Sequence, residues 1–233
     1  MTGIPGELGQ CLRREIKGDV LLDDFSRGRY STDASIYQLM PLGVVIPKDD
    51  HDVEVAVQIA AEAGIPVLPR GSGTSQNGQA IGEALLIDST RHLNKILDFK
   101  PEAQTISVQP GLVLDHLNRF LKPHGMFYPV DVSTANRATL GGMTGNNSCG
   151  ARSIRYGNMV HNVRAVEALL ADGSQVHFGK LNGSMPQPAV PEQLLSSLLS
   201  LGQREAPEIA ARFPDLLRRV GGCNINGLTE EQP

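Results

Sequence analysis

The sequence predicts an α+β protein of two lobes, in which a βαβ unit is followed by a lobe of mixed or antiparallel strands. Between residues 43 and 68, two short apolar runs flank a stretch with the spacing of an amphipathic helix, which is typical of a βαβ unit. Two further strand-like runs then follow each other closely, and Asp172-Gly173 separates another two. Because Asp-Gly accepts the positive φ of a tight hairpin turn, this last pair predicts antiparallel strands.

Length and composition are those of an ordinary globular protein. The chain has 233 residues, of which 40% are hydrophobic and 20% are charged, and it is long enough to bury a core without disulfides. Its formal net charge of -4 and its lack of Lys/Arg runs argue against a nucleic-acid partner. The three cysteines form no CxxC and the six histidines form no HxH or HExxH, so no metal site is predicted.

The sequence gives no sign of export or of membrane insertion. The first ten residues lack a basic region followed by an apolar run, and stretches such as Ala84–Ile87 are too short to cross a bilayer. We therefore expect a cytoplasmic protein with no transmembrane segment.

The first lobe is predicted to begin at residue 30, after an N-terminal extension (1–29) with a short helix at Leu8–Ile16. A buried strand at Gly43–Pro47 should lead into a helix that ends at Gly64. The cap of that helix is expected at Asp49, Asp50 or Asp52. Its apolar face should comprise Val53, Val57, Ala60 and Ala63. The next two strands are expected at Ile65–Leu68 and Ala84–Asp88.

The second lobe is predicted to hold two strand pairs, a helix and a long loop. The helix at Val113–Leu121 should bury Leu117 with Phe120 or Leu121 and end at Pro123-His124-Gly125. The strands are expected at Ile96–Phe99, Thr105–Gln109, Val163–Leu170 and Gln175–Phe178, with a loop rich in Gly and Asn from Asp131 to Gly157. After Gly179 we expect a surface loop at Leu181–Pro191 and helices at Glu192–Leu201 and Pro207–Val220, the second interrupted at Pro214.

A first glycine-rich loop, Pro69–Gly78, follows the second strand of the βαβ unit. Alternating glycines let backbone N–H groups converge on one point, and the loop's Ser and Thr hydroxyls add donors, which suits a pyrophosphate. Gln76 stands where a dinucleotide-binding GxGxxG motif needs glycine, and Gln79 stands where a P-loop needs lysine, so both motifs are excluded. The alternative is a plain surface loop made of small residues.

A second loop, Ser133–Gly150, has almost no large apolar side chain. A loop this long inside a compact domain is usually functional or disordered. Its small residues allow close backbone approach, and its polar groups could pair with a diphosphate or with the edge of a heteroaromatic ring. Cys149 has no partner cysteine, which favours a packing role over a redox role. Arg152, Arg155 and Tyr156 could approach an anion or could form surface pairs.

Taken together, the two loops and their surroundings resemble the FAD/FMN-containing dehydrogenases of the glycolate oxidase and D-lactate dehydrogenase type, which share the vanillyl-alcohol oxidase-like flavin-binding fold. The resemblance runs from about Tyr30 to Gly179, and more faintly to Leu228. Its blocks are YSTDASIYQLMPLGVVIPKD, GIPVLPRGSGTSQNGQAIG, TISVQPGLVLDHLN, STANRATLGGMTGNNSCGARSIRYG and ALLADG. Several blocks in the family's order make the match specific.

The resemblance implies a two-lobed FAD-binding PCMH-type domain over residues 30–233, with FAD between the lobes. Gly71–Ser75 would hold the pyrophosphate, and Val166 would lie on a strand near the adenine. Relatives with covalent flavin have a histidine where Thr74 stands, so FAD would be bound non-covalently. The residues expected to contact FAD are Arg70, Gly71, Ser72, Gly73, Thr74, Ser75, Gly78, Asp131, Ser133, Thr134, Thr139, Gly141, Gly142, Asn146, Asn147, Ser148, Gly150 and Val166.

The resemblance also implies a reaction. The parent enzyme would oxidise a D-2-hydroxy acid of the lactate, glycolate or 2-hydroxyglutarate type by hydride transfer to FAD, and would pass electrons to an acceptor through further domains. The GSEGTLG-like motif and the substrate domain with which the family continues are absent, so we expect a C-terminally truncated chain that is inactive alone. Two alternatives stay open: an inactive FAD-binding module or remnant, and a sugar-acid or aldonolactone oxidoreductase on the same fold.

Overall fold

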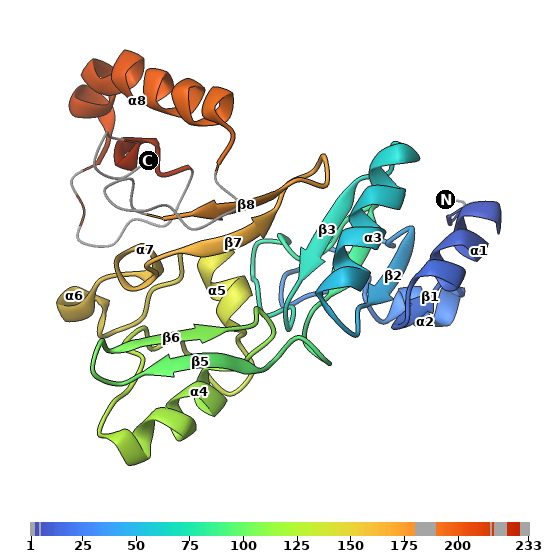
Figure 1. The fold of residues 1–233 in the computed structure, drawn as a ribbon, viewed down its shortest axis with the longest axis horizontal. Coiled ribbons are helices and arrows are strands. Elements are labelled where there is room, and N and C mark those ends of the chain that lie inside the picture. The colour runs from blue at the N-terminus through green and yellow to red at the C-terminus, as the bar shows by residue number, and fades with distance from the viewer. Residues whose placement is uncertain (1–2, 5, 180–189, 215, 217–222, 229–233) are drawn as a thin grey trace.

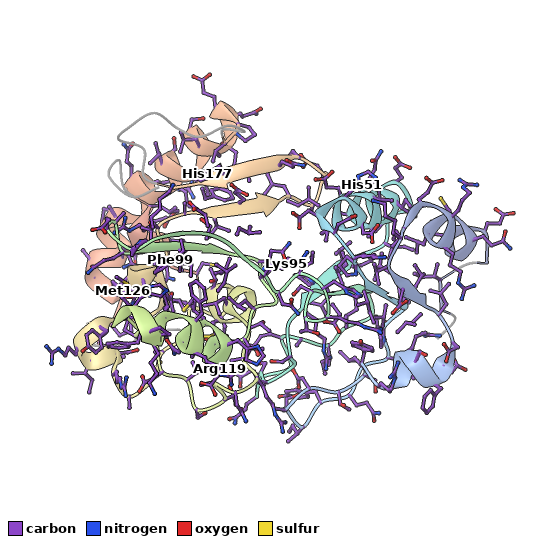
Figure 2. All side chains as sticks on the ribbon, turned by 60° about the horizontal axis from the view of Figure 1, so that its bottom comes forward. His51, Lys95, Phe99, Arg119, Met126 and His177 are labelled. Atoms are coloured by element: carbon purple, nitrogen blue, oxygen red, sulfur yellow. The ribbon has the colours of Figure 1, made fainter. Side chains whose placement is uncertain are left out.

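The structure is a computed structural model that describes residues 3–4, 6–179, 190–214, 216 and 223–228. Two lobes lie next to each other (Figure 1), with α1 (Gly6–Glu15) at one end of the molecule and α8 (Glu192–Arg212) at the other. In Figure 2, His51 lies on the first lobe, Phe99, Arg119 and Met126 lie on the second, and Lys95 lies between them.

The first lobe is built on a four-stranded sheet in the order β1-β2-β4-β3. The strands β2 (Gly43–Ile46), β4 (Leu85–Asp88) and β3 (Val67–Arg70) are parallel, whereas β1 (Asp19–Leu21) pairs antiparallel with β2. Every residue of β2 and of β4 is buried, which is typical of central strands that are covered on both faces. The strands predicted in these two places are confirmed, while β3 begins two residues later than predicted.

Helices cover this sheet and complete the first core. Asp49 caps α3 (Asp50–Glu62) by accepting a hydrogen bond from the backbone N–H of Asp52, and Gly64 follows the helix with a φ of +65°. The core comprises Leu12, Ile16, Val45, Ala56, Val57, Ile59, Ala60, Leu85 and Ile87. Since Leu12 and Ile16 belong to it, the segment before residue 30 packs on the same sheet; α2 (Asp24–Gly28) lies in this segment too. The domain boundary at residue 30 stays a prediction.

The second lobe contains two antiparallel strand pairs and a second core. β5 (Ile96–Lys100) pairs with β6 (Thr105–Val108), and β7 (Val166–Leu169) pairs with β8 (Gln175–Phe178). Gly173 has a φ of +83° in the turn between the last two, so the predicted hairpin is confirmed. The helices are α4 (Leu114–Leu121), the 3-10 turn η1 (Lys122–His124), α5 (Leu140–Gly145), α6 (Ser153–Tyr156) and α7 (Met159–Asn162).

The predicted loop from residue 131 to 157 is wrong in part, because α5 and α6 form within it. Thr139 caps α5, and Leu140 and Met143, three residues apart on one face, are buried in the second core together with Leu112, Leu117 and Val130. A segment rich in glycine therefore does contribute to a core.

The C-terminal region also differs from expectation. A single helix, α8, runs through Pro207 where two helices were predicted. The short turn η2 (Ile225–Gly227) packs against this helix, and Gly202 closely approaches the backbone of Leu228. The surface loop predicted at Leu181–Pro191 lies almost entirely outside the described residues. Within the described ranges, no helix has the length and hydropathy that a membrane span requires.

Candidate functional site

The first glycine-rich loop follows the carboxyl end of β3. The side chain of Arg70, the last residue of β3, holds the loop in place through hydrogen bonds to backbone carbonyls. The Arg70 guanidinium donates to the carbonyl oxygens of Thr32 at 2.8 Å, Ala80 at 3.0 Å and Tyr30 at 3.1 Å. It also lies over the Tyr30 ring, 5.4 Å from the centroid, and burial lowers the pKa of Arg70. Arg70 therefore fixes both ends of the loop to the segment that precedes β2, rather than standing free in solvent.

A run of donors in this loop has no acceptor in the part of the chain that the structure describes. This holds for the five consecutive amides from Gly71 to Ser75, and for the hydroxyls of Ser72 and Thr74. Gly73 adopts a φ of +68° and Gly78 a φ of +78°, a conformation that side chains strongly disfavour. Consecutive N–H groups around such a glycine form a concave anion-binding surface. The residues present thus fit a pyrophosphate.

The second glycine-rich segment, Ser133–Gly150, differs from the first, since the backbone donors in and directly after α5 are already paired. The N–H of Leu140 donates to Leu112 at 2.9 Å, and that of Gly141 donates to Pro110 at 2.8 Å. The amides of Asn146, Asn147 and Ser148 donate to carbonyls of α5. A ligand could contact this segment at its exposed residues, which include Gly142, Gly145 and Asn146.

The two glycine-rich segments meet at two points. At the first, Gly71 lies so close to the Thr139 hydroxyl that a Cβ on Gly71 would overlap Oγ1. At the second, Nε2 of Gln79 donates to Oδ1 of Asn146 at 3.1 Å. The structure therefore brings together the two segments that the sequence singled out, although they are far apart in the chain.

The other predicted site residues lie around this junction or on the hairpin. Asp131 accepts the backbone N–H of Arg152 at 2.9 Å, its carboxylate lies 3.7 Å from the Arg152 guanidinium, and its backbone touches Gly150. Asn147 has a φ of 44° and accepts the N–H of Val160. Ser133 is exposed, Thr134 accepts two backbone N–H groups, and Val166 begins β7, away from both loops in the chain.

Two residues beside the first loop were missed by sequence reasoning. Gln79 contacts both Ser75 and Asn146, and the ring of Tyr37 packs against Gly78. The only local signal for Gln79 was an amide side chain placed inside a run of small residues. Tyr37 lies in the YSTDASIYQ block, where no periodicity marked it.

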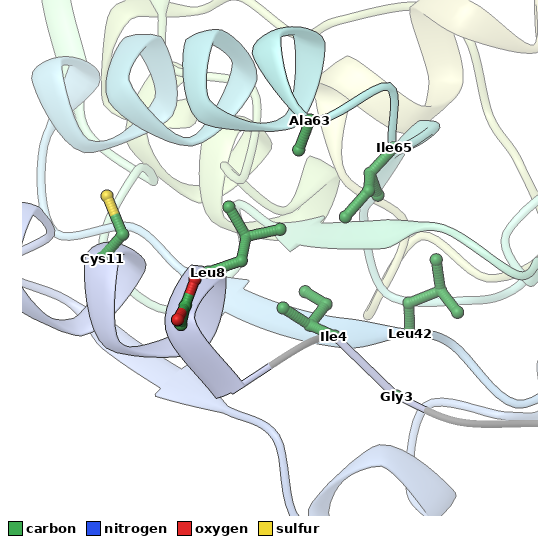
Figure 3. A pocket seen from close by; sticks show the side chains of 8 residues that line it. Gly3, Ile4, Leu8, Cys11, Leu42, Ala63 and Ile65 are labelled. Atoms are coloured by element: carbon green, nitrogen blue, oxygen red, sulfur yellow. The ribbon is translucent and has the colours of Figure 1, made fainter.

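Two hollows elsewhere on the molecule are separate from this junction. One, of about 600 Å³, lies between α1 and the link from α3 to β3 (Figure 3); it is mostly apolar and is lined by residues such as Ile4, Leu8 and Ile65. The other, of about 320 Å³, lies between α3 and the turn of the β7–β8 hairpin. Neither is lined by a residue of the glycine-rich segments.

Solved structures show which class of fold this is. Alkyldihydroxyacetonephosphate synthase superposes with a TM-score of 0.68 at 21% identity, covering 80% of this chain and 37% of that one. Xylooligosaccharide oxidase from Myceliophthora thermophila gives a TM-score of 0.63 at 22% identity, covering 74% of this chain and 37% of that one. The fold is the PCMH-type flavin-binding fold.

Residues 41–179 match the FAD binding domain family, so the chain belongs to that family and the prediction of FAD is confirmed.

Sequence relatives agree with this assignment but are much longer. The chain is 35% identical over 216 residues to a D-2-hydroxyglutarate dehydrogenase of Pantoea ananatis, covering 89% of this chain and 21% of that protein. It is 35% identical over 169 residues to the glycolate oxidase subunit GlcD of Bacillus subtilis, covering 71% of this chain and 36% of that protein. The chain thus spans about a fifth to a third of the length of these curated relatives.

Proposed function

We propose that this chain is the FAD-binding part of a flavin-dependent oxidoreductase that oxidises a D-2-hydroxy acid. In such a reaction a hydride leaves the α-carbon of the substrate and a proton leaves its hydroxyl, which yields a 2-oxo acid. Bound FAD supplies the hydride acceptor. The names of the relatives support this substrate class, because the D-2-hydroxyglutarate dehydrogenases and the glycolate oxidase subunits act on 2-hydroxy acids.

The observation that carries the proposal is the row of unpaired amides from Gly71 to Ser75. These N–H groups, together with the hydroxyls of Ser72 and Thr74, would bind the pyrophosphate of FAD. The second segment, including Thr139, Gly142 and Asn146, would form the wall beside the ribityl chain and the isoalloxazine. Since Thr74 stands where relatives with covalently attached flavin have a histidine, the cofactor would be held non-covalently.

The chain's own residues would bind and orient the cofactor, while the acid–base chemistry belongs elsewhere. We assign the base that takes the hydroxyl proton, and the contact with an electron acceptor, to parts of the protein outside this chain. A cytoplasmic location belongs to the same proposal.

A visible spectrum of the purified chain tests the cofactor assignment directly. We expect the absorption of oxidised flavin, and FAD alone in the supernatant after heat release, because the attachment is non-covalent. A colourless protein that releases NAD would contradict the proposal.

Turnover distinguishes an enzyme part from a bare nucleotide-binding module. D-lactate and D-2-hydroxyglutarate oxidation would be compared between this chain and a version extended to the length of its relatives. We expect activity only in the extended protein. If neither protein is active although both retain FAD, the module without enzymatic activity is favoured.

A further inference from the structure

We propose that Gln79 is a positioning residue that fixes the first glycine-rich loop to the end of α5, so that the loop's free amides point at the cofactor. The inference rests on the proposed function. Gln79 was not among the residues expected to bind FAD, and it need not touch the cofactor to act in this way.

The chemistry of the glutamine side chain suits it to this bridge. A primary amide carries an acceptor oxygen and a donor nitrogen on the same planar group. In Gln79 the oxygen accepts from the Ser75 hydroxyl within the loop, and the nitrogen donates to Asn146 Oδ1 at 3.1 Å across the junction. The Ser75 hydroxyl also accepts the N–H of Asn77 at 3.3 Å, so the bridge extends into the loop backbone.

The position of this bridge explains why it affects orientation. The start of the loop touches the start of α5 where Gly71 meets Thr139, and Gln79 ties the end of the loop to Asn146, the C-cap of α5. On the side of the first lobe the loop is already held by Arg70 and by the N–H of Ala34, which donates to the Gly73 carbonyl at 3.0 Å. The contacts at Gly71 and Gln79 set the orientation of the loop relative to α5. The amides from Gly71 to Ser75 lie between these two points.

The bridge should affect cofactor binding more than folding. Gln79 and Asn146 are both exposed, and a hydrogen bond at an exposed position contributes little to the free energy of unfolding. A loop that must be ordered when the ligand arrives, however, lowers the affinity for that ligand.

The test is FAD binding by the full chain and its Gln79→Met variant, which keeps the length of the side chain and removes both polar atoms. We expect the Kd for FAD to rise roughly tenfold, which corresponds to the loss of one or two hydrogen bonds. Gln76→Met is the matched control, because Gln76 lies in the same loop and its side chain has no hydrogen bond in the described part of the chain. The control should bind FAD like the wild type.

A double-mutant cycle with Asn146→Ala separates positioning from a general structural role. If Gln79 acts through Asn146, the Gln79→Met change should add little to the Kd of the Asn146→Ala variant, and the cofactor-free Tm should stay within about a degree of wild type in all variants. Two results would overturn this inference and leave the proposed function standing. One is a double variant whose rise in Kd equals the product of the rises in the two single variants, and the other is a Gln79→Met variant with the wild-type Kd. A wild-type chain that binds no FAD would overturn the inference together with the proposed function.

Discussion

Gly71 is the residue at which the two halves of the candidate site come closest. A Cβ there would overlap Thr139 Oγ1 and would lie 3.5 Å from Thr139 Cβ and 3.7 Å from Cγ2. The last two separations are ordinary van der Waals contacts, so the conflict is with the hydroxyl alone. That hydroxyl also caps α5 by accepting from the N–H of Gly142, which leaves it little freedom to move away.

Replacing Gly71 with alanine should therefore push the first loop away from α5. We expect Gly71→Ala to weaken FAD binding by at least about tenfold, because the loop's amides would no longer converge on the place they now surround. Isothermal titration with FAD measures this. The control is Gly28→Ala, since a Cβ on Gly28 meets nothing within 4 Å.

A second substitution identifies the cause. In a Thr139→Ala background the overlapping oxygen is gone, so Gly71→Ala should raise the Kd much less than it does in the wild type. An equal loss of affinity in both backgrounds would mean that backbone freedom at Gly71, rather than contact with Thr139, is what matters.

At the scale of elements, the Asp52 side chain joins several parts of the first lobe. It is fully buried in the first turn of α3, and its carboxylate accepts the backbone N–H groups of Lys17 at 2.9 Å, Gly18 at 2.9 Å and Lys48 at 2.8 Å. Lys17 and Gly18 lie between α1 and β1, and Lys48 lies between β2 and α3. One carboxylate thus fixes the start of α3 to the segment that leads into β1 and to the segment that follows β2.

We expect Asp52→Ala to lower the free energy of unfolding by roughly 3 kcal/mol, because three backbone donors would lose a charged acceptor in a buried position. Urea denaturation measures this change. Asp50→Ala is the matched control: Asp50 is exposed in the same helical turn, and its loss should cost only a few tenths of a kcal/mol through the helix dipole. Similar losses for both variants would show that the buried network is not the source of the stability.

The elements that could be predicted are those whose local pattern agrees with their final environment. The strand at Gly43–Ile46 and the helix capped at Asp49 are examples. α5 could not be predicted, because three of its six residues are glycine and local propensity disfavours a helix there; burial of Leu140 and Met143 outweighs that preference. In α8, the helix-forming residues on both sides of Pro207 likewise outweigh the proline.

In the candidate site too, local sequence patterns predict some features, whereas long-range contacts decide others. Alternating glycines and hydroxyls between residues 71 and 75 favour an anion-binding loop, with a plain surface loop as the alternative, because this property depends on the local backbone. The bond between Gln79 and Asn146 joins residues 67 positions apart, and no local pattern pairs them. The placement of β4 between β2 and β3 is a long-range feature of the same kind.

At the scale of the whole molecule, the β7–β8 hairpin contacts the first lobe and so links the two lobes. Gln175 of β8 donates to Glu54 of α3 at 2.5 Å, and Leu169 of β7 packs against the core of the first lobe. A ligand held between segments of both lobes should therefore stabilise them together.

We expect FAD at about 100 times its Kd to add roughly 2.7 kcal/mol to the free energy of unfolding, if it binds only the folded chain. Thermal melts over a series of FAD concentrations measure this, with riboflavin, which lacks the pyrophosphate, as the control ligand. A Tm that does not change with FAD would contradict a competent site in this chain.

Each lobe also contains a partly buried tyrosine whose ionisation at high pH would lower the free energy of unfolding. Burial, and secondarily the nearby Asp88 carboxylate, raises the pKa of Tyr30 from its ordinary 10.0 to about 12; its hydroxyl donates to Asp88 Oδ2 at 2.9 Å. Burial alone raises the pKa of Tyr128 to about 12, where its hydroxyl lies 3.3 Å from Met159 Sδ. Tyr30 contacts the first sheet and Tyr128 the second core, so both lobes are affected.

The sign of the pH dependence follows from these shifts. Between about pH 10 and pH 12 the unfolded chain has lost protons that the folded chain still holds, so the free energy of unfolding falls as pH rises. The contribution of both tyrosines is fully present below pH 10 and is lost by about pH 12. We therefore expect Tm to fall over this window and the Tyr30→Phe, Tyr128→Phe double variant to show a shallower fall. Tyr37→Phe removes a hydroxyl from a ring that is 55% exposed and should keep the wild-type slope. An equally steep fall in the double variant would mean that lysines or the backbone, and not these two phenols, set the alkaline limit of the fold.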